Sequence, residues 1–166
     1  MSQTGYDYAP KGKPMPVCEP GDFVFAAVAL DHGHINGMCN GLLEAGGQLR
    51  WVFDPDPLKV RAFQENFPGV ETAKSLVQVL EDPKVNLVAA AAIPSERGPL
   101  GVEVMRAGKN YFTDKTPFTE LGQLAEAKSV AAETGKKYMV YYSERLHVEC
   151  AVFAGDLVQE DRKSVV

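Results

Sequence analysis

The chain has 166 residues, of which 45% are apolar and 23% are charged, and this is the composition of a globular protein and not of a disordered chain. Its length fits one domain of about 100–200 residues. The 17 basic and 22 acidic residues leave a net charge of −5, which argues against non-specific binding of nucleic acid, because neutralising phosphates needs a basic surface.

The sequence has neither the ~18-residue apolar run of a membrane span nor an amino-terminal signal pattern. Its three cysteines, Cys18, Cys39 and Cys150, are too few and too scattered for a disulfide framework. We therefore expect a cytoplasmic protein with reduced thiols and no contact with a membrane.

Residues 1–20 hold four prolines and little apolar periodicity, which predicts a flexible amino-terminal extension. The unbroken apolar run at residues 23–30 predicts a strand that is buried on both faces. A helix is expected next, ending at the glycines of residues 46–47. Its apolar stripe consists of Ile35, Met38, Cys39, Leu42 and Leu43.

Residues 49–53 predict the second strand, and Asp56 before Pro57 predicts the start of a helix that ends at residues 68–69. Ser75 has the spacing of a cap for a short helix ending near Asp82. Residues 85–93 predict the third strand.

A helix is then expected from about Pro99 to Ala107, a strand at residues 110–113, a helix from Thr119 to Thr134 and a strand at residues 137–142. The apolar stripe of the helix to Thr134 would comprise Leu121, Leu124, Ala125 and Ala131. Strands that alternate with helices predict an α/β fold with a doubly wound parallel sheet of the Rossmann type, formed by a single domain at residues 21–157. Such sheets bind ligands at the carboxyl ends of their strands.

The first turn after a strand, residues 31–37 (DHGHING), is a candidate phosphate-binding turn. Compared with the dinucleotide pattern G-x-G-x-x-G, only Gly33 is in place, but the following helix would offer free N–H groups to a phosphate. The candidate contacts are His32, Gly33, His34 and Ile35. The alternative is a plain strand–helix turn with Asp31 as the helix cap.

Asp54 ends the second strand, 21 positions after Gly33, close to the ~20 expected for the acid that binds the adenosine ribose. A carboxylate there accepts ribose hydroxyls and repels a 2′-phosphate, which favours NAD over NADP. Asp56 suits a helix cap better. The alternative is that both acids only start a helix.

His32 and His34 form an H-x-H pair, but the sequence shows no third or fourth ligand beside them, so we predict no metal site. Asp114 and Lys115 follow a strand, where a carboxylate and an ammonium could orient a substrate hydroxyl and move its proton. A surface turn with a local ion pair is the alternative.

Five segments, taken in their order along the chain, resemble segments of the amino-terminal domain of the Gfo/Idh/MocA oxidoreductases (glucose–fructose oxidoreductase, inositol dehydrogenase and relatives). The segment KNYFTDKTPF, at residues 109–118, is similar to the family's G-K-h-h-h-E-K-P motif, with Asp114 for Glu and Thr116 for Pro. Residues 92–95 (AIPS) resemble the family's A-T-P-N turn. Residues 53–56 (FDPD), the turn at 31–37 and residues 142–145 (YSER) complete the series.

The resemblance implies an NAD(P)-dependent oxidoreductase acting on a sugar or polyol, with Lys115 as the catalytic residue beside the nicotinamide. It also implies that Ile93, Pro94 and Asp114 contact the cofactor. Family members add a second domain that binds substrate, supplies a catalytic histidine and mediates oligomers. A non-catalytic domain that binds or senses a dinucleotide is the alternative, and S-adenosylmethionine is a third, less favoured ligand.

Only about nine residues follow Leu157, so the resemblance predicts a truncated fragment that is inactive by itself. Residues 161–166 (DRKSVV) and a stop match the translation of a common sequencing adapter, which predicts a non-native or disordered tail at residues 158–166. Without the second domain, we expect the apolar residues Val148, Ala151, Val152 and Phe153 to be exposed and to promote association.

Overall fold

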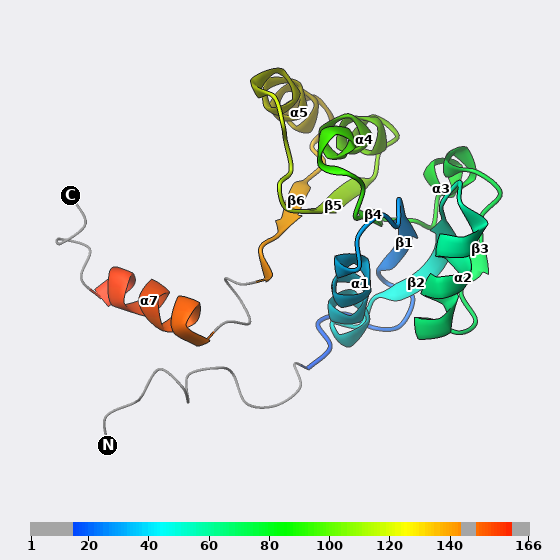
Figure 1. The fold of residues 1–166 in the computed structure, drawn as a ribbon, viewed down its shortest axis with the longest axis horizontal. Helices are drawn as coiled ribbons and strands as arrows, with labels where there is room; N and C mark the ends of the chain where they lie inside the picture. Colours follow the sequence, from blue (N-terminus) through cyan, green and yellow to red (C-terminus); the bar gives the residue numbers. More distant parts are fainter. Residues whose placement is uncertain (1–14, 144–148, 161–166) are drawn as a thin grey trace. The chain divides into compact units, whose positions relative to one another are not determined.

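A computed structural model describes residues 15–143 and 149–160 of the chain (Figure 1). The chain divides into two compact units, one of residues 14–141 and one of residues 1–13 with 142–166. Within the described residues, no helix is both long and apolar enough to cross a membrane.

The unit of residues 14–141 is built on one six-stranded sheet in the order β3-β2-β1-β4-β5-β6, and all of its strand pairs are parallel. The predicted α/β fold with a doubly wound parallel sheet is therefore confirmed. The strands are β1 (Val24–Val28), β2 (Gln48–Phe53), β3 (Glu71–Thr72), β4 (Leu87–Ala90), β5 (Asn110–Asp114) and β6 (Tyr138–Tyr141).

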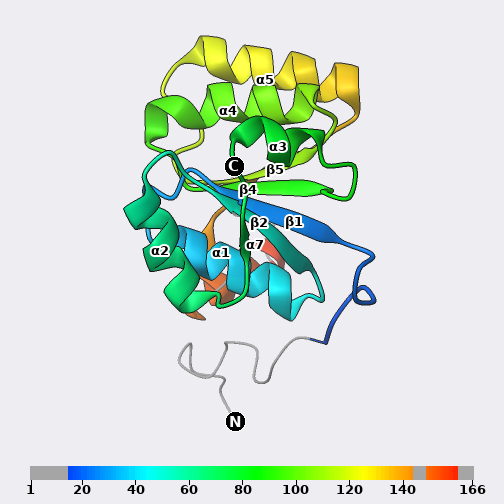
Figure 2. The ribbon, with the colours of Figure 1, turned by 90° about the vertical axis from the view of Figure 1, so that its right-hand side faces the viewer.

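Helices cover both faces of this sheet, as Figure 2 shows. On one face lie α1 (His34–Glu44) and α2 (Pro57–Asn66), and on the other lie α3 (Leu76–Glu81), α4 (Pro94–Arg106) and α5 (Leu121–Thr134). Each face has its own apolar core, and β1 and β4 contribute alternate residues to both cores. The second unit contains α7 (Glu149–Glu160), which includes the first three residues of the expected tail.

Several predicted helix boundaries are confirmed in atomic detail. The Asp56 carboxylate accepts a hydrogen bond of 2.8 Å from the Leu58 amide, and the Ser75 hydroxyl accepts one of 3.2 Å from the Gln78 amide. These side chains satisfy amides that the first turn of a helix leaves unpaired.

The start of α4 differs from the prediction, because the helix begins at Pro94 and contains Pro99 in its interior. Proline fits the first helical position, where no amide donor is needed, but Pro99 cannot donate to the carbonyl of Ser95 one turn earlier. The Gln123 side chain on α5 donates to this carbonyl instead, at 3.1 Å. A contact between two helices thus replaces the hydrogen bond that Pro99 cannot make, and α4 begins one turn earlier than predicted.

The apolar stripe predicted for α5 is wrong for Leu121, Leu124 and Ala125, which are exposed, whereas Ala131 packs against the core as predicted. Leu121 is 85% exposed and Leu124 is 38% exposed, whereas Ala127 and Val130 are buried. The helix packs through its small residues because it lies close to α4, and the larger leucines remain outside the contact. The short strand β3 was not predicted at all, since two residues carry no readable periodicity.

Gly101 allows α4 to lie directly on two aromatic rings. A Cβ at this position would overlap the ring of Tyr138 and come within 2.6 Å of Tyr111. The two rings pack edge to face with centroids 5.0 Å apart. A side chain at position 101 would push α4 away from the sheet.

We expect Gly101→Ala to lower the free energy of unfolding by about 1–3 kcal/mol, because neither the rings nor the backbone can yield without strain. Gly122→Ala on α5 is the matched control, since a Cβ there meets nothing within 4 Å. The control is expected to raise stability by up to about 1 kcal/mol, because alanine favours a helix. Urea denaturation of both variants measures the difference, and equal effects would contradict the assigned contact.

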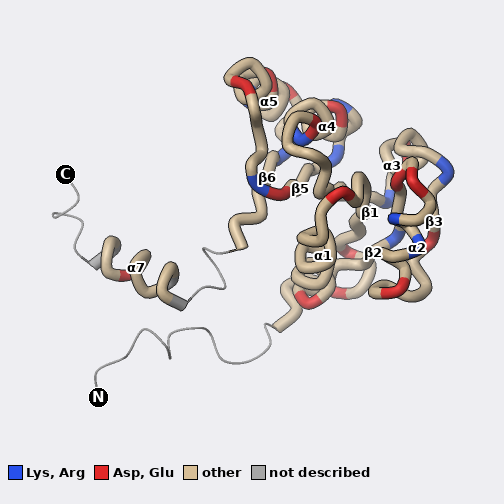
Figure 3. Tube along the Cα trace, in the orientation of Figure 1, with Lys and Arg blue, Asp and Glu red and all other residues tan. Residues whose placement is uncertain are grey.

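Basic and acidic residues lie among one another around α2, α3 and β3 (Figure 3). The best-defined ion pair there joins Arg50 to Asp82 with 2.5 Å between Nε and Oδ2, and the Trp51 indole donates to the same oxygen at 2.8 Å. Burial by itself would raise the pKa of Asp82, but the hydrogen bonds from Arg50, Trp51 and the Lys84 amide outweigh it and lower the pKa to about 2.

Because the pKa of Asp82 is lower in the folded chain, its contribution to stability is complete above the unfolded value of about 3.9 and is lost as the pH falls toward 2. We expect Asp82→Asn to lower the stability at pH 7 and to flatten its decline between about pH 4 and pH 2. The exposed Asp22→Asn is the control. Denaturation curves at each pH measure both, and parallel pH profiles for Asp82→Asn and the unmodified chain would contradict this role.

Candidate functional site

The carboxyl ends of β1, β2, β4 and β5 lie along one edge of the parallel sheet, and the predicted site residues follow these ends. Two groups of polar side chains form there. One surrounds Asp54 at the ends of β1 and β2, and the other surrounds Asp114 at the end of β5. Residues 80 positions apart in sequence meet in the second group.

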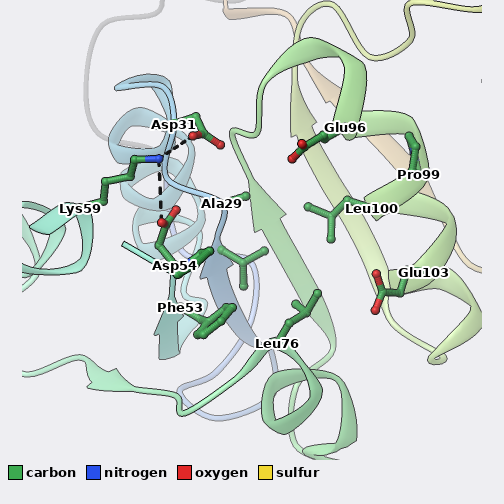
Figure 4. A pocket seen from close by; sticks show the side chains of 12 residues that line it. Ala29, Asp31, Phe53, Asp54, Lys59, Leu76, Glu96, Pro99, Leu100 and Glu103 are labelled. Carbon is green, nitrogen blue, oxygen red and sulfur yellow. Dashed lines mark hydrogen bonds and ion pairs between the residues drawn. The ribbon is translucent and has the colours of Figure 1, made fainter. Parts of the chain in front are cut away.

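A cavity of about 440 Å³ opens beside Asp54 (Figure 4). Its walls are largely apolar, and carboxylates stand on two sides, with one ammonium, that of Lys59, between Asp31 and Asp54. The lining residues are Val28, Ala29, Asp31, Phe53, Asp54, Pro55, Lys59, Leu76, Glu96, Pro99, Leu100 and Glu103.

Asp54 is nearly buried, at 7% exposure, and both of its oxygens accept backbone amides. Oδ2 accepts from Leu30 at 2.7 Å and Oδ1 from Asp56 at 2.9 Å. The carboxylate therefore ties the turn after β1 to the turn after β2. Each oxygen keeps a further lone pair that could accept another donor.

Lys59 connects the acids on the β1 and β2 side of the cavity. Its ammonium donates to Asp31 at 2.6 Å and lies 3.9 Å from the nearer oxygen of Asp54. The hydrogen bond to Asp31 raises the pKa of Lys59; burial opposes this rise, while Asp54, Asp31 and Asp56 reinforce it electrostatically. Asp31 thus pairs with a lysine and does not cap α1, which has Gly33 at its cap position.

The turn after β1 departs from the expected phosphate-binding geometry. Its amides already have acceptors within the turn, since His34 donates to the His32 Nδ1 and Ile35 to the His32 carbonyl, each at 3.2 Å. Ala29 has a positive φ of 50°, the left-handed conformation that glycine normally supplies. This conformation could not be predicted from the sequence, because alanine rarely adopts it.

The second group brings two predicted residues of this turn to Asp114. The His34 Nδ1 lies 3.0 Å from Oδ1 of Asp114, and the His32 Nδ1 lies 3.4 Å from Oδ2. The two imidazole rings meet edge to face with centroids 4.2 Å apart. Asp114 is 2% exposed, whereas both imidazoles reach the surface.

Arg97 is the residue of this group that sequence reasoning missed. Its guanidinium is buried and donates to the Ala92 carbonyl at 2.6 Å, to the Thr116 carbonyl at 3.2 Å and to Asp114 at 3.4 Å. It therefore joins the end of β4 to the turn after β5 and offsets the charge of Asp114. An arginine next to Pro94 and Ser95 offered no sequence signal of its own, because this helix was expected to begin later.

Lys115 is half-buried, and its backbone is held on both sides. Its amide donates to Asp114 Oδ1 at 2.8 Å, and the next carbonyl, of Thr116, accepts from Arg97. The other predicted contacts lie at the start of α4, where Ile93 is the cap residue and is 46% exposed, and Pro94 is the first helical residue. Of the predicted YSER segment, residues 144 and 145 lie outside the described residues, as do Val148 and the side chain of Val152.

Loss of the Arg97 charge should leave Asp114 buried without compensation. We expect Arg97→Met to lower the free energy of unfolding by about 3–5 kcal/mol. The matched control on the same helix is Arg106→Met, because Arg106 pairs with Glu126 at the surface, with 59% and 51% exposure, and such pairs contribute about 0–1 kcal/mol.

The double variant Arg97→Met with Asp114→Asn tests the pairing itself. If the two side chains compensate each other, urea denaturation will give a combined loss smaller than the sum of the two single losses. Additive losses, to within about 0.3–0.5 kcal/mol, would instead mean that Arg97 acts only through the two carbonyls.

The comparison with protein families gives a match to the Gfo/Idh/MocA family model, described as the oxidoreductase family's NAD-binding Rossmann fold, over residues 27–142. No curated protein sequence matches the chain. Among solved structures, one similar chain is a protein named as an oxidoreductase from Erwinia carotovora atroseptica SCRI1043. It has 42% identity and a TM-score of 0.80, over 84% of this chain and 42% of that chain.

Two more distant structures share the fold. The WlbA dehydrogenase from Chromobacterium violaceum, in complex with NADH and UDP-GlcNAcA, has 22% identity and a TM-score of 0.74, over 90% of this chain and 43% of that one. GenD2 from gentamicin A biosynthesis, in complex with NAD, has 23% identity and a TM-score of 0.67, over 80% of this chain and 36% of that one. The chain thus spans about two fifths of the length of these proteins. With a family match over residues 27–142 on a parallel sheet of the expected order, the chain belongs to the Gfo/Idh/MocA oxidoreductase family and carries its NAD-binding Rossmann domain.

Proposed function

We propose that the chain binds NAD along the carboxyl edge of its sheet and forms the cofactor-binding part of an oxidoreductase that acts on a sugar or polyol. The adenosine would lie in the cavity beside Asp54, the phosphates at the turn before α1, and the nicotinamide near Lys115. When bound, the cofactor would accept or donate the hydride.

The observation that carries the choice of cofactor is the charge of the cavity beside Asp54. Four carboxylates line it, those of Asp31, Asp54, Glu96 and Glu103, against the one ammonium of Lys59. That ammonium already pairs with Asp31. A ribose with free hydroxyls fits such a wall, whereas a 2′-phosphate would meet net negative charge, and this favours NAD over NADP.

The residues around Lys115 are arranged to hold its backbone still. Asp114 and Arg97 fix the peptide groups on either side of it, so the side chain starts from a defined position at the sheet edge. An ammonium held there can polarise a substrate hydroxyl and lower the cost of removing its proton. The sugar or polyol substrate is proposed from the family and from the UDP-sugar bound by the WlbA dehydrogenase.

A second candidate is a domain that binds or senses the dinucleotide without catalysis. Both candidates require a phosphate to replace the internal hydrogen bonds of the His34 and Ile35 amides. The two candidates differ in turnover and not in binding. Absorbance assays with NAD and a panel of polyols separate them, and turnover abolished by Lys115→Ala would support the enzyme.

We expect the 166-residue chain to bind NADH more tightly than NADPH. We also expect no turnover by this chain alone, because hydride transfer needs the substrate held about 3–3.5 Å from the nicotinamide, and in the family a second domain binds the substrate. Asp54→Asn should weaken NADH binding about tenfold, or about 1.4 kcal/mol, by loss of charged acceptors for the ribose. NADH fluorescence titrations measure these affinities, with the exposed Asp22→Asn as control.

Thermal unfolding of Asp54→Asn must accompany the titration, since Asp54 also holds two backbone amides. A stable variant with unchanged NADH affinity would remove Asp54 from the ribose site. Tighter binding of NADPH than of NADH by the unmodified chain would contradict the proposed role of the acidic cavity.

A further inference from the structure

Lys59 is, among the described residues, the one basic residue that lines the cavity beside Asp54, and it reaches this cavity from the first turn of α2 (Figure 4). Its ammonium donates to Asp31 at 2.6 Å and lies 3.9 Å from the nearer oxygen of Asp54. Since the ribose hydroxyls are proposed to bond to Asp54, a phosphate on the 2′-hydroxyl would lie beside this ammonium. The residue best placed to bind NADP is therefore already paired with an acid.

The position of Lys59 in its helix favours the binding of an anion. It is the third residue of α2, which begins at Pro57. The amino end of a helix carries a positive partial charge, which stabilises a phosphate nearby and does not stabilise a lysine. The Lys59 ammonium thus adds to the positive potential of the helix end, and this potential must be offset by the neighbouring carboxylates or by an anionic ligand.

The Asp31 carboxylate has no second partner that would explain its place in the turn after β1. Among the residues that the structure describes, Lys59 is the one partner of this carboxylate, whereas Asp54 is also held by two backbone amides. The side chains of Asp31 and Lys59 are 27% and 37% exposed, and ion pairs this accessible to water contribute little to stability. We therefore expect the pair to affect which ligand binds more than whether the chain folds.

We propose that Asp31 determines the preference for NAD over NADP by pairing with Lys59, so that the ammonium is not available to a 2′-phosphate. This inference rests on the proposed binding of NAD beside Asp54. Asp54 repels a 2′-phosphate directly, whereas Asp31 acts through the lysine, because it offsets the charge of the ammonium and accepts one of its three protons. Without the charge of Asp31, the same cavity offers the ammonium to the phosphate oxygens of NADP.

Fluorescence titrations of the 166-residue chain and its variants with NADH and with NADPH, at one fixed ionic strength, test this role. The readout is the ratio of the Kd for NADPH to the Kd for NADH. The ratio is needed because Asp31 lies in the turn that is proposed to hold the phosphates, so that loss of its charge strengthens the binding of both dinucleotides. We expect Asp31→Asn to lower the ratio about tenfold, the order of effect of one unit charge near a phosphate at an accessible site. Asp31→Ser removes the same charge with another side chain and is expected to act alike.

The double variant Asp31→Asn with Lys59→Met shows whether the lysine carries the effect. If the released ammonium binds the 2′-phosphate, the double variant loses most of the tenfold change. Lys59→Met alone alters the ratio much less, because its ammonium is already engaged by Asp31. Arg61→Met is the matched control, since Arg61 is exposed on the same helix and does not line the cavity.

Glu103→Gln is the control for Asp31→Asn, because it removes a carboxylate from the α4 side of the same cavity and leaves Lys59 paired (Figure 4). We expect a smaller change in the ratio than with Asp31→Asn. Thermal unfolding of every variant shows that it is folded under the conditions of the titration.

Three results would overturn this inference: a ratio that Asp31→Asn leaves unchanged, a change that persists in the double variant, or equal changes with Asp31→Asn and Glu103→Gln. In each case saturable binding of NADH in the same titrations would still support the proposed function. If the unmodified chain binds neither dinucleotide, the proposed function fails and this inference fails with it.

Discussion

The candidate site depends on a buried negative charge that the fold must compensate. Asp114 ends β5 with 2% exposure, and a carboxylate in such a place is stable only if donors surround it. Arg97, the Lys115 amide and His34 supply them. Since these donors come from α4, the turn after β5 and the first turn of α1, the charge of one residue fixes three segments that are distant in sequence.

Asp54 has a corresponding role at the other end of the same edge. It accepts hydrogen bonds from amides in the turns after β1 and β2 and so connects these two turns. Parallel strands end at one edge, and each polar group buried at a strand end needs partners from a neighbouring turn. The residues that hold the turns are therefore the ones that border the proposed cofactor, and stability and recognition cannot be varied separately here.

Much of the fold could be predicted from sequence, because apolar runs, helical stripes and the capping residues Asp56 and Ser75 are local signals. The positions of Asp54, His34 and Asp114 at one edge also follow from strand–helix alternation. The role of Arg97 could not be predicted from these local signals, since it rests on hydrogen bonds to residues 5, 17 and 19 positions away. The hydrogen bond from the His34 amide to the His32 side chain could not be predicted either, because it depends on the rotamer of His32.

The proline inside α4 has a consequence for how the domain folds. Pro99 leaves the Ser95 carbonyl without a helical donor, and the side chain that satisfies it belongs to α5, 28 residues further along. The first turn of α4, which carries Arg97, is thus complete only when α5 has docked. Local opening of α5 would loosen the anchor of the turn after β5, so the outermost helix and the strand ends beneath it form one cooperative unit.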